Sequence, residues 1–186
     1  MAALCSVCLA EDLADRATRE FLAKDYVAAE RDFREMTKAD PGSFFAQAYL
    51  GHSLFRQKRF AEAIAPYEKA LELEHGGKKL SQKDHRILVD QLVMSYGMGG
   101  QIKKLYPVLD QAIKADPDYA LNYYNLACAY GEEGNKAKML ANLDLAFHHK
   151  DHLIEGEKMP DPRKDSSFKK FVADPDFVSL MKKLEI

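Results

Sequence analysis

The chain has 186 residues, of which 47% are hydrophobic and 30% charged, a composition that excludes a disordered protein and suits one soluble helical domain. Its 27 basic and 29 acidic side chains nearly cancel and form no long run of one sign, so the charge pattern of a nucleic-acid-binding or membrane-surface protein is missing. Three cysteines, an odd number in a chain long enough to form its own core, indicate no disulfide framework.

Residues 1–10 form a small apolar run that stops at Glu11 and Asp12. The run is too short to span a bilayer, which needs ~20 residues, and it lacks the positively charged start of a secretory signal. Two interpretations stay open, a frayed end and the remnant of a signal peptide. The first favours a cytoplasmic protein, and the second a periplasmic or secreted one.

Similar residues recur 34 positions apart between residues 10 and 150. The spacing predicts four units, each a pair of antiparallel helices, at about 10–43, 44–76, 86–119 and 120–150. An insertion at about 76–85 separates the second unit from the third. The pairs that show the period are Ala29 and Ala63, Phe33 and Tyr67, Leu92 and Leu126, Tyr96 and Tyr130, Gly100 and Gly134, and Ala112 and Ala146.

The first unit predicts helices at 11–23 and 26–39, joined by a turn at Lys24. Lys24 occupies a turn position that suits glycine, so this unit is a degenerate terminal repeat. In the second unit, Gly51 supplies a small residue where the two helices cross. Pro66 lies inside its second helix and predicts a bend there.

We interpret the insertion partly as a loop after Gly76 and partly as an early extension of the next helix, starting after Ser81. The period is lost after His148. Residues 151–186 then predict a connector and two short capping helices, because apolar residues return at helical spacing from Phe168 onward.

Two stretches resemble the tetratricopeptide repeat family, Tyr49-Leu50-Gly51 with the helix that follows it and the run from Tyr123 to Gly131. The resemblance implies an all-α fold, a right-handed superhelical solenoid of antiparallel helix pairs with C-terminal capping helices. It also implies that the first helix of each pair lines a concave groove for extended peptides or partner helices, without catalysis or a cofactor. The chain departs from the family pattern in having no tryptophan.

The place of each residue in the period implies which side chains line this groove. Aromatic and methionine side chains prevail, which suits the burial of partner side chains. We expect exposure in the groove for Tyr49 and Tyr124, whereas Phe55 fits better as packing between helices. The predicted groove residues are Phe45, Tyr49, His52, Phe55, Arg56, Gln91, Met94, Met98, Tyr124, Asn125, Cys128 and Glu132.

The predicted partner is an unidentified protein or peptide, and the sequence argues against the C-terminal tail of a chaperone. Family members that bind such tails hold the terminal carboxylate with lysine, asparagine and arginine at set groove positions. Without those donors a carboxylate would be poorly held. Here the positions hold Ala14, Thr18, Tyr49, Ile87 and Gln91, and Asn125 is a match only in the fourth unit.

Two alternatives to a peptide-binding scaffold stay open. One is an exported, periplasmic or envelope assembly scaffold that acts through self-association as a homo-oligomer. The other is a metal-dependent activity at His148 and His152, whose spacing could place two imidazoles on one helix face, although no third ligand is fixed.

The cysteines offer little chemistry. Cys5 and Cys8 form a single CxxC without a second ligand pair or a redox context, and Cys128 fits best as a small buried hydrophobe. We therefore predict a non-enzymatic protein without catalytic residues or a resident metal.

Overall fold

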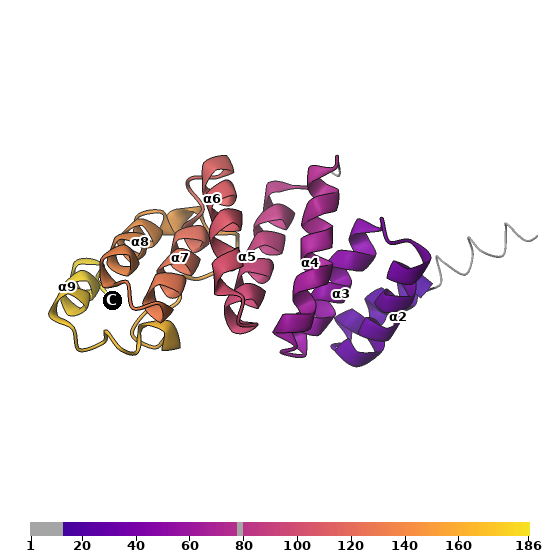
Figure 1. Cartoon of the computed structure of the whole chain (residues 1–186), viewed down its shortest axis with the longest axis horizontal. Coiled ribbons are helices and arrows are strands. Elements are labelled where there is room, and N and C mark those ends of the chain that lie inside the picture. Colours follow the sequence, from indigo (N-terminus) through magenta and orange to yellow (C-terminus); the bar gives the residue numbers. More distant parts are fainter. Residues whose placement is uncertain (1–12, 78–79) are drawn as a thin grey trace, which may run out of the picture. The chain divides into compact units, whose positions relative to one another are not determined.

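Every helix predicted from the period is present in the computed structural model, which describes residues 13–77 and 80–186 (Figure 1). These residues contain no strand, and the predicted all-α fold is confirmed. They divide into two units, the first ending at Gln101 and the second beginning at Ile102, within the predicted third helix pair. The predicted apolar segment at 1–10, with its two cysteines, lies outside the described residues.

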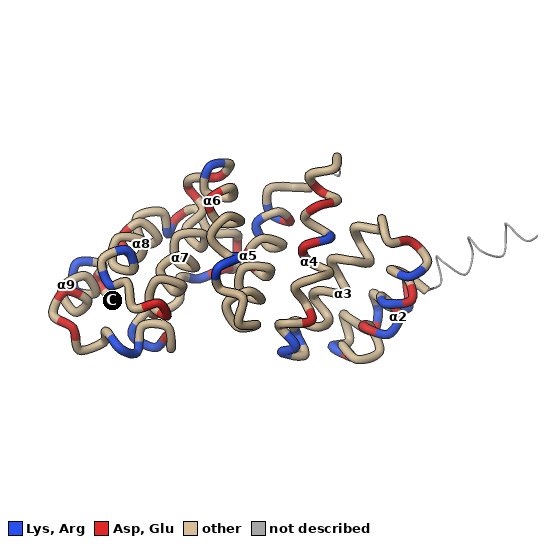
Figure 2. Tube along the Cα trace, in the orientation of Figure 1, with Lys and Arg blue, Asp and Glu red and all other residues tan. Residues whose placement is uncertain are grey.

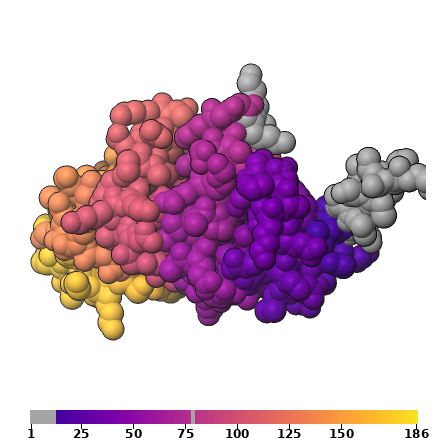
Figure 3. All heavy atoms as spheres, turned by 45° about the vertical axis from the view of Figure 1, so that its right-hand side comes forward, coloured from indigo at the N-terminus to yellow at the C-terminus, as the bar shows by residue number. Residues whose placement is uncertain are grey.

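In the first unit, a helix at 13–22 is followed by α2 (Tyr26–Ala39), α3 (Phe44–Arg56), α4 (Phe60–His75) and α5 (Gln82–Met98). From α2 onward each helix packs against the next, and side chains fill the spaces between them (Figure 3). α4 continues through Pro66. α5 has 17 residues against 13 in α3, so part of the insertion lengthens this helix at its start.

Left-handed residues at matching places in the period end the first helix of each pair. Lys24 and Lys58 have φ of 65° and 60°, and Gly100 and Gly134 have 77° and 76°. The residue that follows each of them donates its N–H back to the helix, as Arg59 does to the Leu54 carbonyl at 3.0 Å. The turn therefore needs a residue with a left-handed backbone, and lysine adopts this conformation at Lys24, where glycine would be the usual residue.

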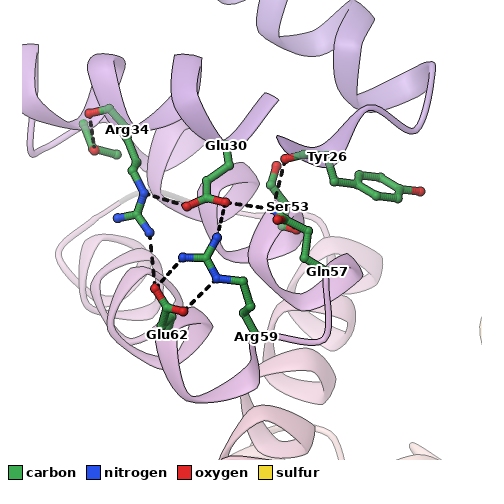
Figure 4. Close-up of polar contacts among 8 residues, drawn as sticks. Tyr26, Glu30, Arg34, Ser53, Gln57, Arg59 and Glu62 are labelled. Atoms are coloured by element: carbon green, nitrogen blue, oxygen red, sulfur yellow. Dashed lines mark hydrogen bonds and ion pairs between the residues drawn. The ribbon is translucent and has the colours of Figure 1, made fainter. Parts of the chain in front are cut away.

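A network of charged side chains fastens α2 to the second helix pair (Figure 4). Glu30 on α2 is only 8% exposed and accepts hydrogen bonds from Gln57 Nε2 and Arg34 Nε at 2.8 Å each. Arg59, just before α4, donates to both Glu30 and Glu62. Burial alone would raise the pKa of Glu30, but these hydrogen bonds and the nearby arginine charges outweigh it and lower the pKa.

Asp32, also on α2, is fully buried and ties this helix to the one before it. Its carboxylate accepts hydrogen bonds from Arg16 Nε in the helix at 13–22 and from Arg31 Nε at 2.8 Å. Burial would raise the pKa of Asp32, but the two arginines reverse the effect and hold the pKa below its usual value.

The second unit contains η1 (Ile102–Lys104), α6 (Leu105–Ala115), α7 (Ala120–Glu132), α8 (Lys136–His148), η2 (Lys150–His152), η3 (Ser166–Phe168) and α9 (Pro175–Lys183). α7 and α8 pack as an antiparallel pair, and residues from η3 and α9 complete their core. The buried members of this core are Tyr124, Ala127, Met139, Leu143, Ala146, Phe168, Phe177 and Met181.

The prediction of two C-terminal capping helices is half right. α9 is the second of them, capped by Asp174 with Pro175 in its first turn. The first is only the 3-10 turn η3, followed by further turns. Pro175 disfavours a helical conformation at Asp174, so a helix in this segment cannot run on into α9. Phe168, fully buried in the core, nevertheless caps the pair as predicted.

Changing Asp32 to asparagine tests the charged contacts of α2. We expect Asp32→Asn to lower the free energy of unfolding at pH 7 by about 1–3 kcal/mol, because the amide replaces a charged, buried acceptor of two partly buried hydrogen bonds. The wild type should lose stability in acid, because the folded protein lowers the pKa values of Asp32 and Glu30. Their stabilising contribution is complete above the ordinary pKa values of 3.8 and 4.5, and it is lost as the pH falls through the pKa values of the folded protein. Urea unfolding between pH 7 and pH 3 measures both effects.

The matched control is Asp15→Asn, which changes an exposed carboxylate on the helix at 13–22. The control should follow the wild type at every pH, and Asp32→Asn should lose less stability in acid than either. Parallel acid profiles for all three proteins would contradict this account of Asp32.

Candidate functional site

Four ring side chains gather on one side of the first unit. Phe45, Tyr49 and His52 follow one another along α3 at helical spacing, and Phe21 reaches them from the helix at 13–22. The Tyr49 ring centroid lies 4.6 Å from that of Phe45, 5.3 Å from that of Phe21 and 5.4 Å from that of His52. We call these four residues the aromatic face.

Local sequence signals place the aromatic face. Ser43 caps α3, its hydroxyl accepting from the Ala46 N–H at 3.3 Å, and the left-handed Lys58 ends the turn after it. α3 carries a single charged residue, Arg56, at its last position, and its trace is otherwise uncharged (Figure 2). The helix can therefore pack on both sides and still leave Phe45 37% exposed.

A polar node lies at the base of the aromatic face and joins three helices. The hydroxyl of Tyr67 on α4 donates to Gln91 Oε1 on α5, and it lies 2.9 Å from His52 Nδ1 on α3. His52 Nδ1 also contacts Gln91 Oε1. With the Gln91 amide oxygen as the acceptor, we assign the proton of His52 to Nδ1 and the lone pair to Nε2. We call His52, Tyr67 and Gln91 the polar node.

Burial sets the protonation of the node. Desolvation lowers the pKa of His52 below its ordinary value of 6.5, although the hydrogen bond to Gln91 opposes this effect. Burial, with the charge of Asp90, raises the pKa of Tyr67. At neutral pH the node therefore consists of a neutral imidazole, a neutral phenol and an amide.

Tyr67 reaches the node because Gly51 has no side chain. The Tyr67 ring is fully buried, and a Cβ atom on Gly51 would lie 2.6 Å from its Cδ1 and Cε1 atoms. Such a distance is shorter than any ordinary carbon contact. Gly51 thus fixes how closely α3 and α4 approach and where the Tyr67 hydroxyl stands.

The other predicted groove residues of the first unit have mixed surroundings. Phe55 is half-buried, with its ring edge-on to Phe60 at 5.2 Å, as its packing interpretation requires. The Arg56 guanidinium is exposed above the Tyr26 ring at 5.1 Å. On α5, Met94 and Met98 are 38% and 61% exposed.

In the second unit, the predicted exposure of Tyr124 is wrong. Tyr124 is 3% exposed, its hydroxyl donates to Asp165 Oδ2 at 3.0 Å, and the Phe168 ring lies edge-on to it at 5.8 Å. The C-terminal segment folds back along α7, so that the Ser167 carbonyl oxygen lies 2.6 Å from the place of a Cβ atom on Gly131. This covering segment lies outside the period, which is why the sequence did not reveal it.

Of the remaining predicted residues of α7, Cys128 lies against the same segment. Cys128 is half-buried with its Sγ atom 3.8 Å from Asp165 Oδ2, and burial together with that carboxylate raises the pKa of the thiol. The cysteine therefore stays protonated at neutral pH and is a poor nucleophile. Asn125 is half-buried, and Glu132 is exposed.

Two parts of the chain, residues 48–74 and 108–141, each match a sequence model of the tetratricopeptide repeat. The first match covers most of α3 and α4, and the second runs from α6 into α8. The chain is a tetratricopeptide repeat protein. No curated protein matches its sequence.

Solved structures share the fold of this repeat protein at low sequence identity. A crystal structure of MamA protein aligns with a TM-score of 0.71 and 20% identity, over 94% of this chain and 89% of that chain. Another crystal structure of MamA gives 0.65 and 17%, over 77% and 79%. YrrB, described as a TPR protein with an unusual peptide-binding site, gives 0.63 and 15%, over 92% and 82%. At such identities the likeness shows the fold alone.

The structure also shows the surroundings of the histidines near the end of α8. His149 stacks on the Tyr123 ring at 5.3 Å and lies 3.4 Å from Asp118, while His148 and His152 are exposed. Within the part of the chain that the structure describes, no three histidine, cysteine or acidic side chains are placed to hold a metal ion together. Nor is any described helix both long and apolar enough to cross a membrane.

Sequence reasoning missed two members of this site. Phe21 lies 34 positions before Phe55, a signal that the degenerate first repeat concealed. Tyr67 was recognised only as a member of the 34-residue period; its ring lies in the core, but its hydroxyl extends to the polar node.

Replacing Gly51 with alanine tests the fit between α3 and α4. Alanine favours a helix over glycine by roughly 1 kcal/mol, yet we expect Gly51→Ala to lower the free energy of unfolding by about 1–2 kcal/mol net, because overpacking against the Tyr67 ring costs more. Urea unfolding measures the change. Gly97→Ala on α5 is the control, since no atom outside its own stretch of helix lies within 4 Å of its Cβ position, and it should be stabilising. Equal effects of the two substitutions would refute the proposed fit.

Proposed function

We propose that this tetratricopeptide repeat protein is a non-enzymatic scaffold that holds a segment of a partner protein against the aromatic face. The observation that carries the proposal is the combination of a preformed ring cluster with partial exposure. Phe45 and Met94 keep over a third of their surface open, and Tyr49 and His52 are half-buried. Aromatic rings and methionines are the side chains that peptide-binding surfaces use to gain apolar contact at low entropic cost.

The chemistry of the face favours an apolar anchor on the partner. α3 contributes no charge to it apart from Arg56 at its end, and that guanidinium is engaged with the Tyr26 ring. Burial of one large apolar side chain contributes roughly 1.5–3 kcal/mol, so two or three anchors give a useful affinity after the cost of association. The likeness to YrrB, itself described as having a peptide-binding site, supports this role by analogy of fold.

A free carboxylate terminus is a poor candidate for the anchor. The positions that hold such a group in some family members contain no lysine or arginine here, and Gln91 at one of them already accepts from Tyr67. A partner that binds through a chaperone-type tail would meet a neutral polar node instead of cationic donors. The proposed partner is therefore an internal segment with apolar side chains.

The double variant Phe45→Ala, Met94→Ala tests the proposal. Both side chains are partly exposed, so the fold should survive while the partner contact weakens. We expect proteins captured from the native cell's lysate by the wild type to be lost at least tenfold in the variant, as measured by quantitative mass spectrometry. The control Val172→Ala, Val178→Ala removes similarly exposed apolar surface from the second unit and should capture the wild-type set.

Equal capture by the face variant and the wild type would contradict the proposed site. Capture of nothing but further copies of the chain would point to a self-assembling scaffold instead. Circular dichroism of all three proteins confirms that any loss arises from the surface and not from unfolding.

A further inference from the structure

Two hydrogen-bonding groups of the polar node are left without a partner. Gln91 Oε1 accepts from Tyr67, and His52 Nδ1 is directed at the same oxygen. Among residues 13–77 and 80–186, no contact occupies His52 Nε2 or the amide nitrogen of Gln91. Neither atom is among the fully buried unpaired polar atoms of this part of the chain, so each keeps some accessible surface.

The two open groups have opposite hydrogen-bonding character. His52 Nε2 offers a lone pair because Nδ1 carries the proton, and the Gln91 nitrogen offers two N–H donors. This assignment follows from Gln91 Oε1 being the acceptor that Tyr67 and His52 share. The node therefore offers one acceptor and one donor, and the His52 ring lies next to those of Tyr49 and Phe21.

We propose that the polar node binds an amide group of the partner segment, either a backbone peptide unit or an asparagine or glutamine side chain. The partner N–H donates to His52 Nε2, and the partner carbonyl accepts from the Gln91 amide. An adjoining apolar side chain of the partner packs on Phe45 and Tyr49. This inference rests on the proposed function and adds the chemical group that the face selects.

Charged groups fit the node less well than an amide does. A carboxylate has no proton for the His52 lone pair and would be repelled by it, and an ammonium has no acceptor for the Gln91 N–H groups. An amide satisfies both at once, and an unsatisfied partner at either atom would weaken binding. The node thus discriminates by hydrogen-bond pattern and not by charge attraction.

Three small probes that share one ring test the selectivity of the folded wild-type protein. They are 3-phenylpropanamide, 3-phenylpropanoate and 3-phenylpropylammonium, titrated at pH 7 and followed by ¹H–¹⁵N NMR. We expect the amide to bind at least fivefold more tightly than either charged probe, with the largest shifts at the Gln91 side-chain amide and the His52 ring. Equal affinities, or amide-induced shifts elsewhere alone, would overturn the inference.

Gln91→Glu supplies the matched variant. The carboxylate still accepts from Tyr67 and His52 but offers no N–H, so the amide probe should bind at least fivefold more weakly. Gln47→Glu makes the same change on α3, where the Gln47 side chain contacts the Pro41 carbonyl instead, and it should bind the probe like the wild type. Unchanged binding to Gln91→Glu would overturn the amide assignment.

The outcomes separate this inference from the proposed function. If all three probes bind equally and Tyr49→Ala abolishes that binding, the aromatic face remains a docking surface and only the amide selectivity is wrong. If the amide does not perturb His52 or Gln91 at all, the inference fails, and the capture experiment with Phe45 and Met94 decides the function independently.

Discussion

The fit of the Tyr67 ring against the bare backbone of Gly51 is the constraint on which the aromatic face depends. It sets the approach of α3 to α4 and carries the Tyr67 hydroxyl to Gln91 and His52. His52 in turn packs against Tyr49, so one buried phenol orders both the polar and the aromatic parts of the surface. A binding surface held this way loses little freedom on meeting a partner.

Other contacts hold the first unit together without occupying that face. Glu30 and Asp32 accept hydrogen bonds from arginines on α2 itself and on neighbouring elements. Their lowered pKa values mean that the charged network stabilises the unit at neutral pH. The second unit reaches closure differently. Its own C-terminal segment covers Tyr124 and supplies Phe168 to the core. The two units therefore share a repeat but differ in how much of their first-helix surface stays open.

The period in the sequence was enough to predict the helices and their turns, because buried positions repeat with the helix pair. It even located the turn at Lys24, which adopts a left-handed backbone without glycine. It failed for Tyr124, since the segment that buries this residue has no repeat to align. The polar node could not be predicted from the sequence either. The hydrogen bond between Tyr67 and Gln91 depends on how adjacent helices approach and not on spacing along one helix.

The most direct test of this account is the ring tautomer of His52, read from a long-range ¹H–¹⁵N correlation spectrum at pH 7. The account predicts a neutral ring with the proton on Nδ1, because Gln91 Oε1 can only accept and burial lowers the pKa of the imidazole. Nε2 would then appear as an unprotonated, pyridine-like nitrogen. A proton on Nε2, or a charged ring at pH 7, would show that the node is not arranged as described and would remove the basis for its selectivity.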